Sequence, residues 1–568
     1  MDLELIIALR EEIGNSDLFV GRKKELDFFL DWADKTKRQL SQSTAILSRK
    51  KKGKTALVQR LYNILYTKND PQIIPFYFKV EEGKKTQLHF SDIFFRTLLT
   101  QYFGYKQREK EYIGQVLPYD ELKKLAGDDQ YLNNEIDFMI KILEREDGDE
   151  AWMHARNAGH RISSNKDERI IQIIDEFQFL NEFIYVSNDF QTKIELAAFY
   201  QSTAESKVSP QIITGSYIGW LSAIIGRMVA RYRSYNLTGF NDREALGAVY
   251  NYSNIYELEV TEESAAYIAK VCENDPYYIA QIFRSQYPDK DLTEVTNIVE
   301  ILNYETTVTD GAIGRMWSEY IWNAVNRVND KNGKKIILYL SKYADEERTR
   351  EEILKDLNLD LTDRELEKRL HQLVKADIIS QGSSNYRFKG LGDRIFEIVF
   401  RKIYEEEIER IGKKELDRQI KEELLSVKKQ VSYYKGMAAE YRVINKLLFA
   451  AIKSVNLQDI VSNYQKPFEL ERFDHVQKKR IHLDQVKSIE LDILCQSDNF
   501  NLVIEVKDWE KTISTKEIEK FIETKRLLDG HFNKQTGYIF YSENGFSDEQ
   551  KKLLEQNGIM YTSGELLK

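Results

Sequence analysis

Residues 44–62 constrain the fold of this chain most, because they join a short apolar run, a basic turn and an amphipathic helix. Residues 45–47 have the composition of a buried strand, and Leu57, Val58 and Leu61 recur at helical spacing. Strand, tight turn and helix in this order are the context that a phosphate-binding loop needs. Backbone N–H groups at the helix start would point at phosphate oxygens, and the helix dipole favours negative charge there. We therefore expect an α/β core that binds a nucleotide.

The turn ends in Gly53-Lys54-Thr55, which carries the chemistry of the motif. Lys54 would reach the terminal phosphates of ATP, and the Thr55 hydroxyl would ligate Mg²⁺. Ser48 stands where the motif G-x-x-x-x-G-K-S/T has its first glycine. Serine tolerates a positive φ less well than glycine, so Ser48 bears on loop geometry and turnover. The alternative is a basic surface loop that precedes a helix and binds no nucleotide.

Residues 170–180 contain a β-branched run that ends in Asp175-Glu176. At the carboxyl end of a parallel strand these carboxylates would face the nucleotide. Asp175 would hold Mg²⁺ through water, and Glu176 would orient or deprotonate the attacking water. The alternative is an acidic strand end without a catalytic role.

Residues 212–216 repeat the pattern of an apolar strand with polar residues at its tip. Thr214 or Ser216 would sense the γ-phosphate, although a plain strand-to-loop turn explains them equally well. Arg231 is a candidate arginine finger, because that role needs a planar and permanently charged donor. A surface salt bridge is the alternative for Arg231. A finger that acts in trans would require a homo-oligomer.

Residues 18–290 resemble the archaeal-type ATPase family, a branch of the AAA+/STAND P-loop ATPases. The resemblance implies an ATP-driven switch rather than a metabolic kinase, and residues 241–325 would then be a helical lid. The matching motifs are Phe19-Val20-Gly21-Arg22, Gly53-Lys54-Thr55, Ile174-Asp175-Glu176-Phe177-Gln178, Thr214-Gly215-Ser216 and Asn274-Asp275-Pro276-Tyr277-Tyr278.

Composition excludes several classes of protein. A net charge of −9 argues against a uniformly basic nucleic-acid coat. The two cysteines, Cys272 and Cys495, lie far apart and fit a reducing cytoplasm without a disulfide framework. None of the seven histidines has HExxH spacing, which argues against a zinc hydrolase. No apolar stretch approaches the ~18 residues of a membrane span. We therefore expect a cytoplasmic protein without a membrane partner.

Residues 326–400 have the pattern of a winged helix. Thr349 and Glu352, and again Thr362 and Glu365, are spaced as capping boxes that open two helices. The outward residues of the later helix carry both signs of charge, so we favour coupling within the chain over the reading of DNA bases. Residues 401–432 alternate in charge and suggest a solvated helical spacer.

Residues 433–568 read as a second α/β unit with neighbouring strands at 489–496 and 501–508. A hairpin between them would put Asp492 opposite Glu505, and Glu505 and Lys507 would share one face. Two carboxylates at such a short distance repel each other unless a cation lies between them. Mg²⁺ or Mn²⁺ is the natural occupant of such a site.

This segment resembles the PD-(D/E)xK nuclease superfamily. Asp492 takes the Asp position, Glu505-Val506-Lys507 the ExK, and Glu440 the acid on the preceding helix, while Leu491 replaces the usual proline. The resemblance implies a metal-dependent DNA endonuclease, in which Glu440, Asp492 and Glu505 hold the metal. Lys507 would orient or help deprotonate the attacking water. The alternatives are an ordinary charged sheet edge and a nuclease-like fold without activity.

The sequence thus predicts an α/β multidomain protein whose partners are ATP, DNA and a divalent ion. One hypothesis is an ATPase that gates a DNA endonuclease, in defence or the handling of mobile elements. The other is a non-cleaving, ATP-dependent switch or DNA-binding regulator whose C-terminal unit serves for docking. Residues 1–17 read as a short helix, and residues 104–167 as a polar insertion. The expected segments are an ATPase core at 1–240, a lid at 241–325, a winged helix at 326–400, a linker at 401–432 and a nuclease-like domain at 433–568.

Overall fold

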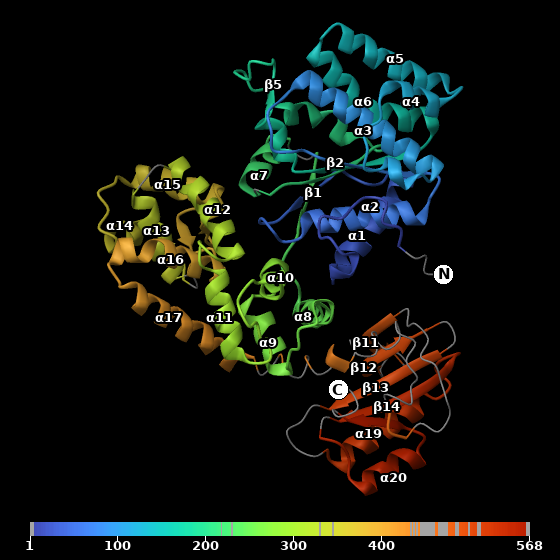
Figure 1. Cartoon of the computed structure of the whole chain (residues 1–568), viewed down its shortest axis with the longest axis vertical. Coiled ribbons are helices and arrows are strands. Elements are labelled where there is room, and N and C mark those ends of the chain that lie inside the picture. The colour runs from blue at the N-terminus through green and yellow to red at the C-terminus, as the bar shows by residue number, and fades with distance from the viewer. Residues whose placement is uncertain are drawn as a thin grey trace.

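The chain has three structured parts, which follow one another along the sequence from blue to red in Figure 1. The structure is a computed structural model. It describes residues 5–563 apart from 217, 229–230, 329–330, 344–345, 432–433, 435–437, 439–440, 444–460, 464–474, 483–487, 498–499, 508–512 and 543.

The first part is built on a parallel sheet with the strand order β2-β4-β6-β1-β7. Every residue of β4 is buried, which explains its nearly continuous apolar sequence. Helices α1 and α2 cover one face of the sheet, and α3 and α6 cover the other (Figure 1). The strands are β1 (Thr44–Leu47), β2 (Ile73–Lys79), β4 (Arg169–Asp175), β6 (Gln211–Thr214) and β7 (Arg233–Asn236), with the short pair β3 (Lys85–Thr86) and β5 (Ile184–Tyr185) beside them.

Residues 104–167 are part of the core of this sheet rather than a polar insertion. Their helices bury Ile136, Met139, Trp152 and Ala155 in the same core as the strands. Because α6 packs along α3, the segment completes one face of the first part. The helices of this part are α1 (Lys23–Lys37), α2 (Lys54–Lys68), α3 (Gln87–Gln107), α4 (Tyr119–Ala126), α5 (Gln130–Glu144), α6 (Gly148–Lys166) and α7 (Ile218–Gly226).

The expected helix over residues 1–17 does not form in the described residues. Residues 5–15 carry no helix, and only the short turn Ser16–Leu18 is helical. The amide side chain of Asn63 on α2 accepts hydrogen bonds from the backbone N–H groups of Ala8 and Leu9. These groups therefore find partners on α2, so the segment needs no helix of its own to satisfy them.

The second part is helical, and its apolar side chains form one continuous core. The expected boundary at residue 325 falls inside α12, which packs on α15 and α16. The helices are α8 (Asp242–Tyr256), α9 (Glu262–Val271), α10 (Pro276–Arg284), α11 (Val295–Glu305), α12 (Ala312–Val328), α13 (Lys331–Lys342), α14 (Arg350–Asp356), α15 (Asp363–Lys375), α16 (Arg394–Glu409) and α17 (Lys413–Ser426).

Of two predictions for the second part, one is confirmed and one is wrong. The capping boxes at Thr349 and Thr362 are confirmed, and they open α14 and α15. The solvated spacer is wrong, because α17 buries Leu416, Ile420 and Leu424 and packs against α11. A small antiparallel sheet, β8 (Arg348–Thr349), β10 (Arg387–Lys389) and β9 (Ser380–Gln381), lies beside these helices.

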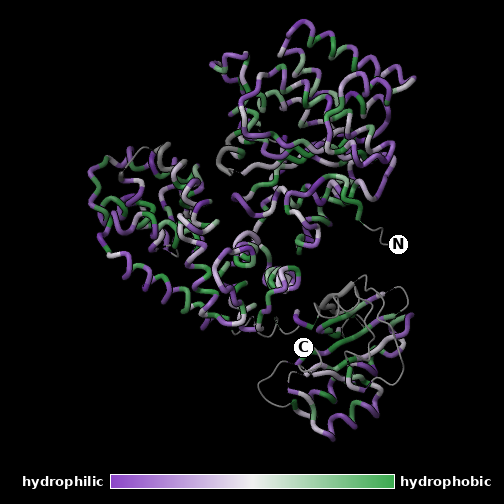
Figure 2. The backbone as a smooth tube through the Cα atoms, in the orientation of Figure 1, coloured by the Kyte–Doolittle hydropathy of each residue, from purple (hydrophilic) through white to green (hydrophobic). Residues whose placement is uncertain are grey.

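The third part is a mixed sheet in the order β11-β12-β13-β14-β15. Strand β13 pairs with β12 antiparallel and with β14 parallel. Its central strands are hydrophobic in Figure 2, consistent with burial beneath α19 and α20. The elements are β11 (His475–His482), β12 (Ser488–Gln496), β13 (Phe500–Lys507), β14 (Gln535–Ser542), β15 (Met560–Ser563), α19 (Thr515–Leu528) and α20 (Asp548–Gln556). Within the described residues of the whole chain, every helix is too short or too polar to span a membrane.

Candidate functional site

The 48–55 loop leaves the carboxyl end of β1, a central strand, and leads into α2. Gly53 is the N-cap of α2 at φ 86°, a left-handed conformation that glycine adopts without steric cost. The other residue of this loop with a positive φ is Lys51, at 68°. Ser48 is not among the residues with positive φ, so the expected difficulty at Ser48 does not arise in this loop.

Lys54 is buried within the loop. Its Nζ donates to the carbonyl oxygens of Ser48 and Arg49, each at 2.8 Å, and to the Ser48 hydroxyl at 3.0 Å. Burial lowers the pKa of Lys54 to about 8, against the opposing charges of Glu176 and Asp175. An anionic ligand at this point would therefore stabilise the protonated ammonium.

Asp175 is the buried centre of a hydrogen-bond network at the end of β4. Its carboxylate accepts from the Thr55 hydroxyl at 2.8 Å, from the Tyr77 hydroxyl at 3.1 Å and from the hydroxyl of Thr214. Burial, with the neighbouring charge of Glu176, raises the pKa of Asp175. Thr55 and Thr214, from separate elements, thus both orient this acid.

Glu176 follows Asp175 in a left-handed conformation at φ 57°, which turns the chain away from β4. Its carboxylate accepts from Gln178 Nε2 at 2.6 Å, from the Ser216 backbone N–H at 3.0 Å and from the Ser216 hydroxyl. Gly215 lies against this network, since a Cβ built there would stand 2.2 Å from Gln178 Oε1. The structure therefore brings Ser216 to Glu176, as it brings Thr214 to Asp175.

Arg231 lies away from the 48–55 loop. Its Nε donates to the Gln201 carbonyl at 3.0 Å and faces Glu205 at 3.3 Å. Strand β7 begins beside Thr44, the first residue of β1, whereas the 48–55 loop follows the last. Arg231 is therefore at the opposite end of β1 and does not face the loop of its own chain. The surface salt bridge, the alternative for this residue, is present with Glu205, and an arginine finger would require the site of a neighbouring subunit.

Cations of the 48–55 loop contact the second part, which the sequence motifs did not predict. Arg49 donates to the Leu391 carbonyl at 2.9 Å, and Lys52 pairs with Asp275, the N-cap of α10. The available signal was the basic run between Ser48 and Gly53, but its partners are more than 200 residues away in sequence.

The third part contains a second cluster, formed by Asp492, Glu505 and Lys507. The register Ile493↔Ile504, continued by one residue, sets Asp492 beside Glu505. Lys507 Nζ lies 2.5 Å from Glu505 Oε1 and 3.7 Å from Asp492 Oδ2. Burial and then the charge of Asp492 raise the pKa of Glu505. The structure thus brings these three predicted residues together, while Glu440 lies outside the described residues.

The two clusters fit a divalent ion unequally. Thr55 and Asp175 offer the oxygen donors that Mg²⁺ prefers, next to the buried Lys54. Asp492 and Glu505 offer two carboxylates, but Lys507 compensates their charge. In the part of the chain that the structure describes, no group of three or more His, Cys, Asp or Glu residues is arranged to hold a metal.

Comparisons with known proteins identify similar solved structures but no family. No family model matches the chain, and no curated protein matches it. A Walker-type ATPase of Pyrococcus abyssi is 15% identical with a TM-score of 0.46, over 70% of this chain and 100% of that one. The ORC2 protein of Aeropyrum pernix is 12% identical with a TM-score of 0.35, over 68% and 95%. The RuvB Holliday junction branch migration motor of Thermotoga maritima is 12% identical with a TM-score of 0.29, over 68% and 96%.

Proposed function

We propose that the chain binds and hydrolyses ATP in its first part and uses this reaction to control a metal-dependent DNA endonuclease in its third part. The observation that carries the ATPase is the meeting of Lys54, Thr55, Asp175 and Glu176 at the carboxyl ends of β1 and β4. A phosphate-binding cation, a hydroxyl and two acids at one edge of a parallel sheet are what nucleotide hydrolysis requires.

Each residue has a defined task in this proposal. The N–H groups at the start of α2 bind the phosphates, and Lys54 contacts the terminal ones. Thr55 and Asp175 would hold Mg²⁺, which neutralises charge that develops on the phosphates. Glu176 orients the attacking water, and Ser216 keeps its carboxylate in place. Thr214 reports on the γ-phosphate through Asp175.

The proposal for the third part rests on the shared face of Asp492, Glu505 and Lys507. A divalent ion between the two acids, with Glu440 as a further ligand, would activate water for attack on a phosphodiester. Lys507 would then orient that water. The winged-helix pattern of residues 326–400 supplies the connection between the two reactions.

Plasmid cleavage with Mg²⁺ and ATP tests the nuclease. Asp492→Ala and Lys507→Ala should each abolish nicking, because both remove a side chain from the reacting cluster. Lys520→Ala is a matched control, since this lysine of α19 lies on the surface and is 67% exposed. Nicking that survives in both cluster variants would remove the nuclease and leave the ATPase.

One observation favours a second candidate, a non-cleaving switch. Lys507 already pairs with Glu505 and approaches Asp492, so the cluster is compensated for charge by the chain itself. The chain would then bind DNA under the control of ATP and use its third part only for docking. Salt-dependent DNA retention without cleavage is the expected result for this candidate.

A further inference from the structure

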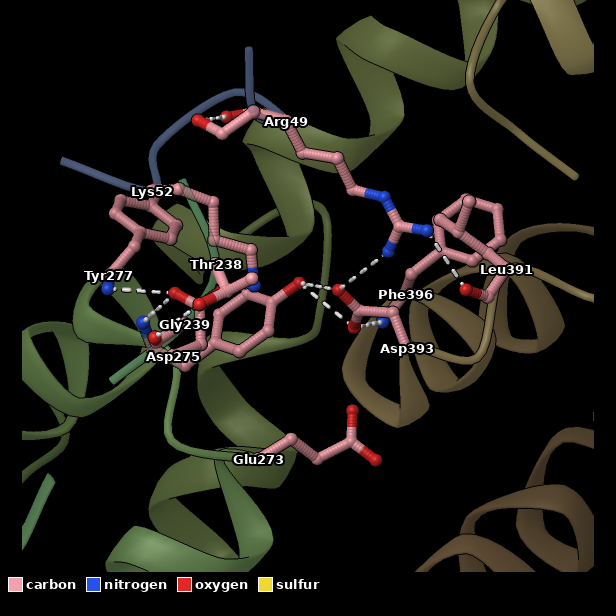
Figure 3. Close-up of polar contacts among 12 residues, drawn as sticks. Arg49, Lys52, Thr238, Gly239, Glu273, Asp275, Tyr277, Leu391, Asp393 and Phe396 are labelled. Atoms are coloured by element: carbon pink, nitrogen blue, oxygen red, sulfur yellow. Dashed lines mark hydrogen bonds and ion pairs between the residues drawn. The ribbon is translucent and has the colours of Figure 1, made fainter. Parts of the chain in front are cut away.

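Arg49 of the 48–55 loop reaches out of the first part into the second (Figure 3). Its Nη2 donates to the Leu391 carbonyl at 2.9 Å. Its guanidinium also lies 3.5 Å from Asp377 Oδ2 and 4.0 Å from Asp393 Oδ2. These three partners belong to residues 331–409, which we call the 331–409 unit. A side chain of the candidate phosphate loop is therefore held by that unit.

The two carboxylates have little access to water. Asp393 has a side chain that is 6% exposed, and Asp377 one that is 18% exposed. Asp393 also caps α16 and accepts hydrogen bonds from the Tyr278 hydroxyl. Burial raises the pKa of Asp377, and the charges of Arg49 and Lys54 oppose this effect. A buried carboxylate is stabilised by such a counter-charge, so Arg49 favours the unit in this position.

A bound nucleoside triphosphate would compete for the same guanidinium. The phosphates would enter the loop that contains Arg49, and a guanidinium binds phosphate oxygens with two parallel hydrogen bonds. If Arg49 turned to them, Asp377 and Asp393 would lose the guanidinium that lies between the loop and the unit. The 331–409 unit would then have to expose these carboxylates to water and leave the loop.

A separate contact ties the same loop to α10. Lys52 pairs with Asp275, which accepts from the N–H groups of Tyr277 and Tyr278 at the start of that helix (Figure 3). Asp275 therefore has hydrogen bonds that do not depend on Arg49. Helix α10 lies in the same core as the 331–409 unit, and its Tyr278 donates to Asp393. The pair of Lys52 and Asp275 is therefore a second contact that must also open when the unit leaves the loop.

We infer that Arg49 is a displaceable latch: Asp377 and Asp393 hold it when the site is empty, and the phosphates of ATP take it and release the 331–409 unit. This inference rests on the proposed ATPase and names its regulation. The carboxylates of the unit act as competitors of the nucleotide, so docking of the unit and binding of ATP oppose each other.

The test uses the full chain, Mg²⁺ and a non-hydrolysable ATP analogue. Calorimetry measures affinity, and hydrogen–deuterium exchange follows residues 387–396. Asp377→Asn removes the competing charge but suits the left-handed φ of 56°, which asparagine tolerates. It should bind the analogue about tenfold tighter, within the range of measured couplings, and show raised exchange without nucleotide. Asp393→Asn is the second variant, because asparagine also caps a helix.

Arg49→Gln separates a latch from a merely structural ion pair. It should also raise exchange without nucleotide, but it should weaken binding of the analogue, because a phosphate ligand is lost. Asp363→Asn is the matched control: this carboxylate of α15 is 61% exposed and faces Arg350 within the same unit. It should change neither measurement.

The outcomes separate the latch from the ATPase. If the wild-type chain binds no ATP analogue, both the ATPase and the latch are contradicted. If it binds the analogue and exchange at 387–396 does not rise, the latch alone is overturned. The latch is also overturned if Asp377→Asn and Arg49→Gln shift the affinity in the same direction.

Discussion

Lys54 carries a charge that its surroundings disfavour, since burial lowers its pKa from the usual 10.5 to about 8. The unfolded chain binds more protons than the folded chain between these two values. Stability should therefore rise with pH in that window. Bound phosphates reverse the situation, because they favour the protonated ammonium.

Nucleotide affinity should accordingly depend on pH. Below pH 8 Lys54 is protonated with and without ATP, whereas above it binding must take up a proton. The Kd for ATP should therefore rise about tenfold per pH unit between 8 and 10. Calorimetry in buffers of different ionisation enthalpy measures the uptake. Lys54→Arg should remove it, since a guanidinium stays charged; a flat Kd in the wild-type chain would contradict the assignment.

Gly215 controls the position of Glu176 through Gln178. The added methyl of Gly215→Ala would meet Gln178 Oε1 at 2.2 Å and displace the amide that donates to Glu176. We expect a drop in kcat for ATP of roughly 10²-fold with little change in KM, as for a misplaced catalytic group. Gly226→Ala is the control, because its Cβ would meet nothing within 4 Å. Equal kinetics in the two variants would show that Glu176 does not act in the reaction.

At the scale of elements, the strand pair β12–β13 sets the geometry of the second cluster. The register places Asp492 so that its Oδ2 accepts from the Val506 backbone N–H at 3.1 Å. A shift by one residue would turn Asp492 to the other face of the sheet. The cluster therefore depends on backbone pairing rather than on a flexible loop.

A divalent ion should stabilise this pair. Mn²⁺ at about 100 times its Kd would add roughly 2.7 kcal/mol and raise the Tm of the third part. Asp492→Asn should abolish this shift, yet leave the metal-free protein at least as stable, because two like charges no longer face each other. Asp529→Asn, 57% exposed after α19, is the control for calorimetric scans. A wild-type Tm that Mn²⁺ leaves unchanged would argue against the metal.

The buried face of α17 should contribute to the stability of the second part. Ile420 is fully buried, so Ile420→Ala should cost roughly 2–5 kcal/mol of unfolding free energy. Glu422→Ala should cost less than about 1 kcal/mol, since its pair with Arg418 lies on the surface. Urea denaturation compares them. Similar urea midpoints of unfolding for both variants would contradict the burial of Ile420 in the core.

At the scale of the whole molecule, the position of Arg231 bears on assembly. Arg231 faces Glu205 at the end of β1 opposite the 48–55 loop. A guanidinium there reaches a nucleotide only if a second subunit presents its own loop. An arginine finger at this position therefore requires an oligomer.

Mixing two inactive variants tests this dependence. Arg231→Ala lacks the finger, and Lys54→Ala lacks the nucleotide site, so each should hydrolyse ATP poorly alone. A mixture should regain activity, because the intact Arg231 of one chain serves the intact site of the other. Lys207→Ala, on the same end of the sheet, is the control. No gain on mixing, and a monomer by size with and without ATP, would exclude the finger.

Local signals in the sequence predicted much of the fold. The strand at 45–47 and the capping boxes at Thr349 and Thr362 depend on neighbours in the chain, and the structure contains all of them. The candidate sites followed the same rule, since Asp175 ends a strand and the alternation of side chains around residue 505 sets a face.

The places where distant segments meet could not be read from local patterns. Asn63 satisfies the backbone of residues 8 and 9 without a helix, α11 buries the apolar stripe of a charged helix, and Arg49 finds its partners 328 and 344 residues away (377 − 49 and 393 − 49). Most elements and their chemistry follow from the local sequence, because propensity and capping act over a few residues. Their contacts needed the folded chain, because hydrogen bonds and ion pairs depend on distance in space rather than along the backbone.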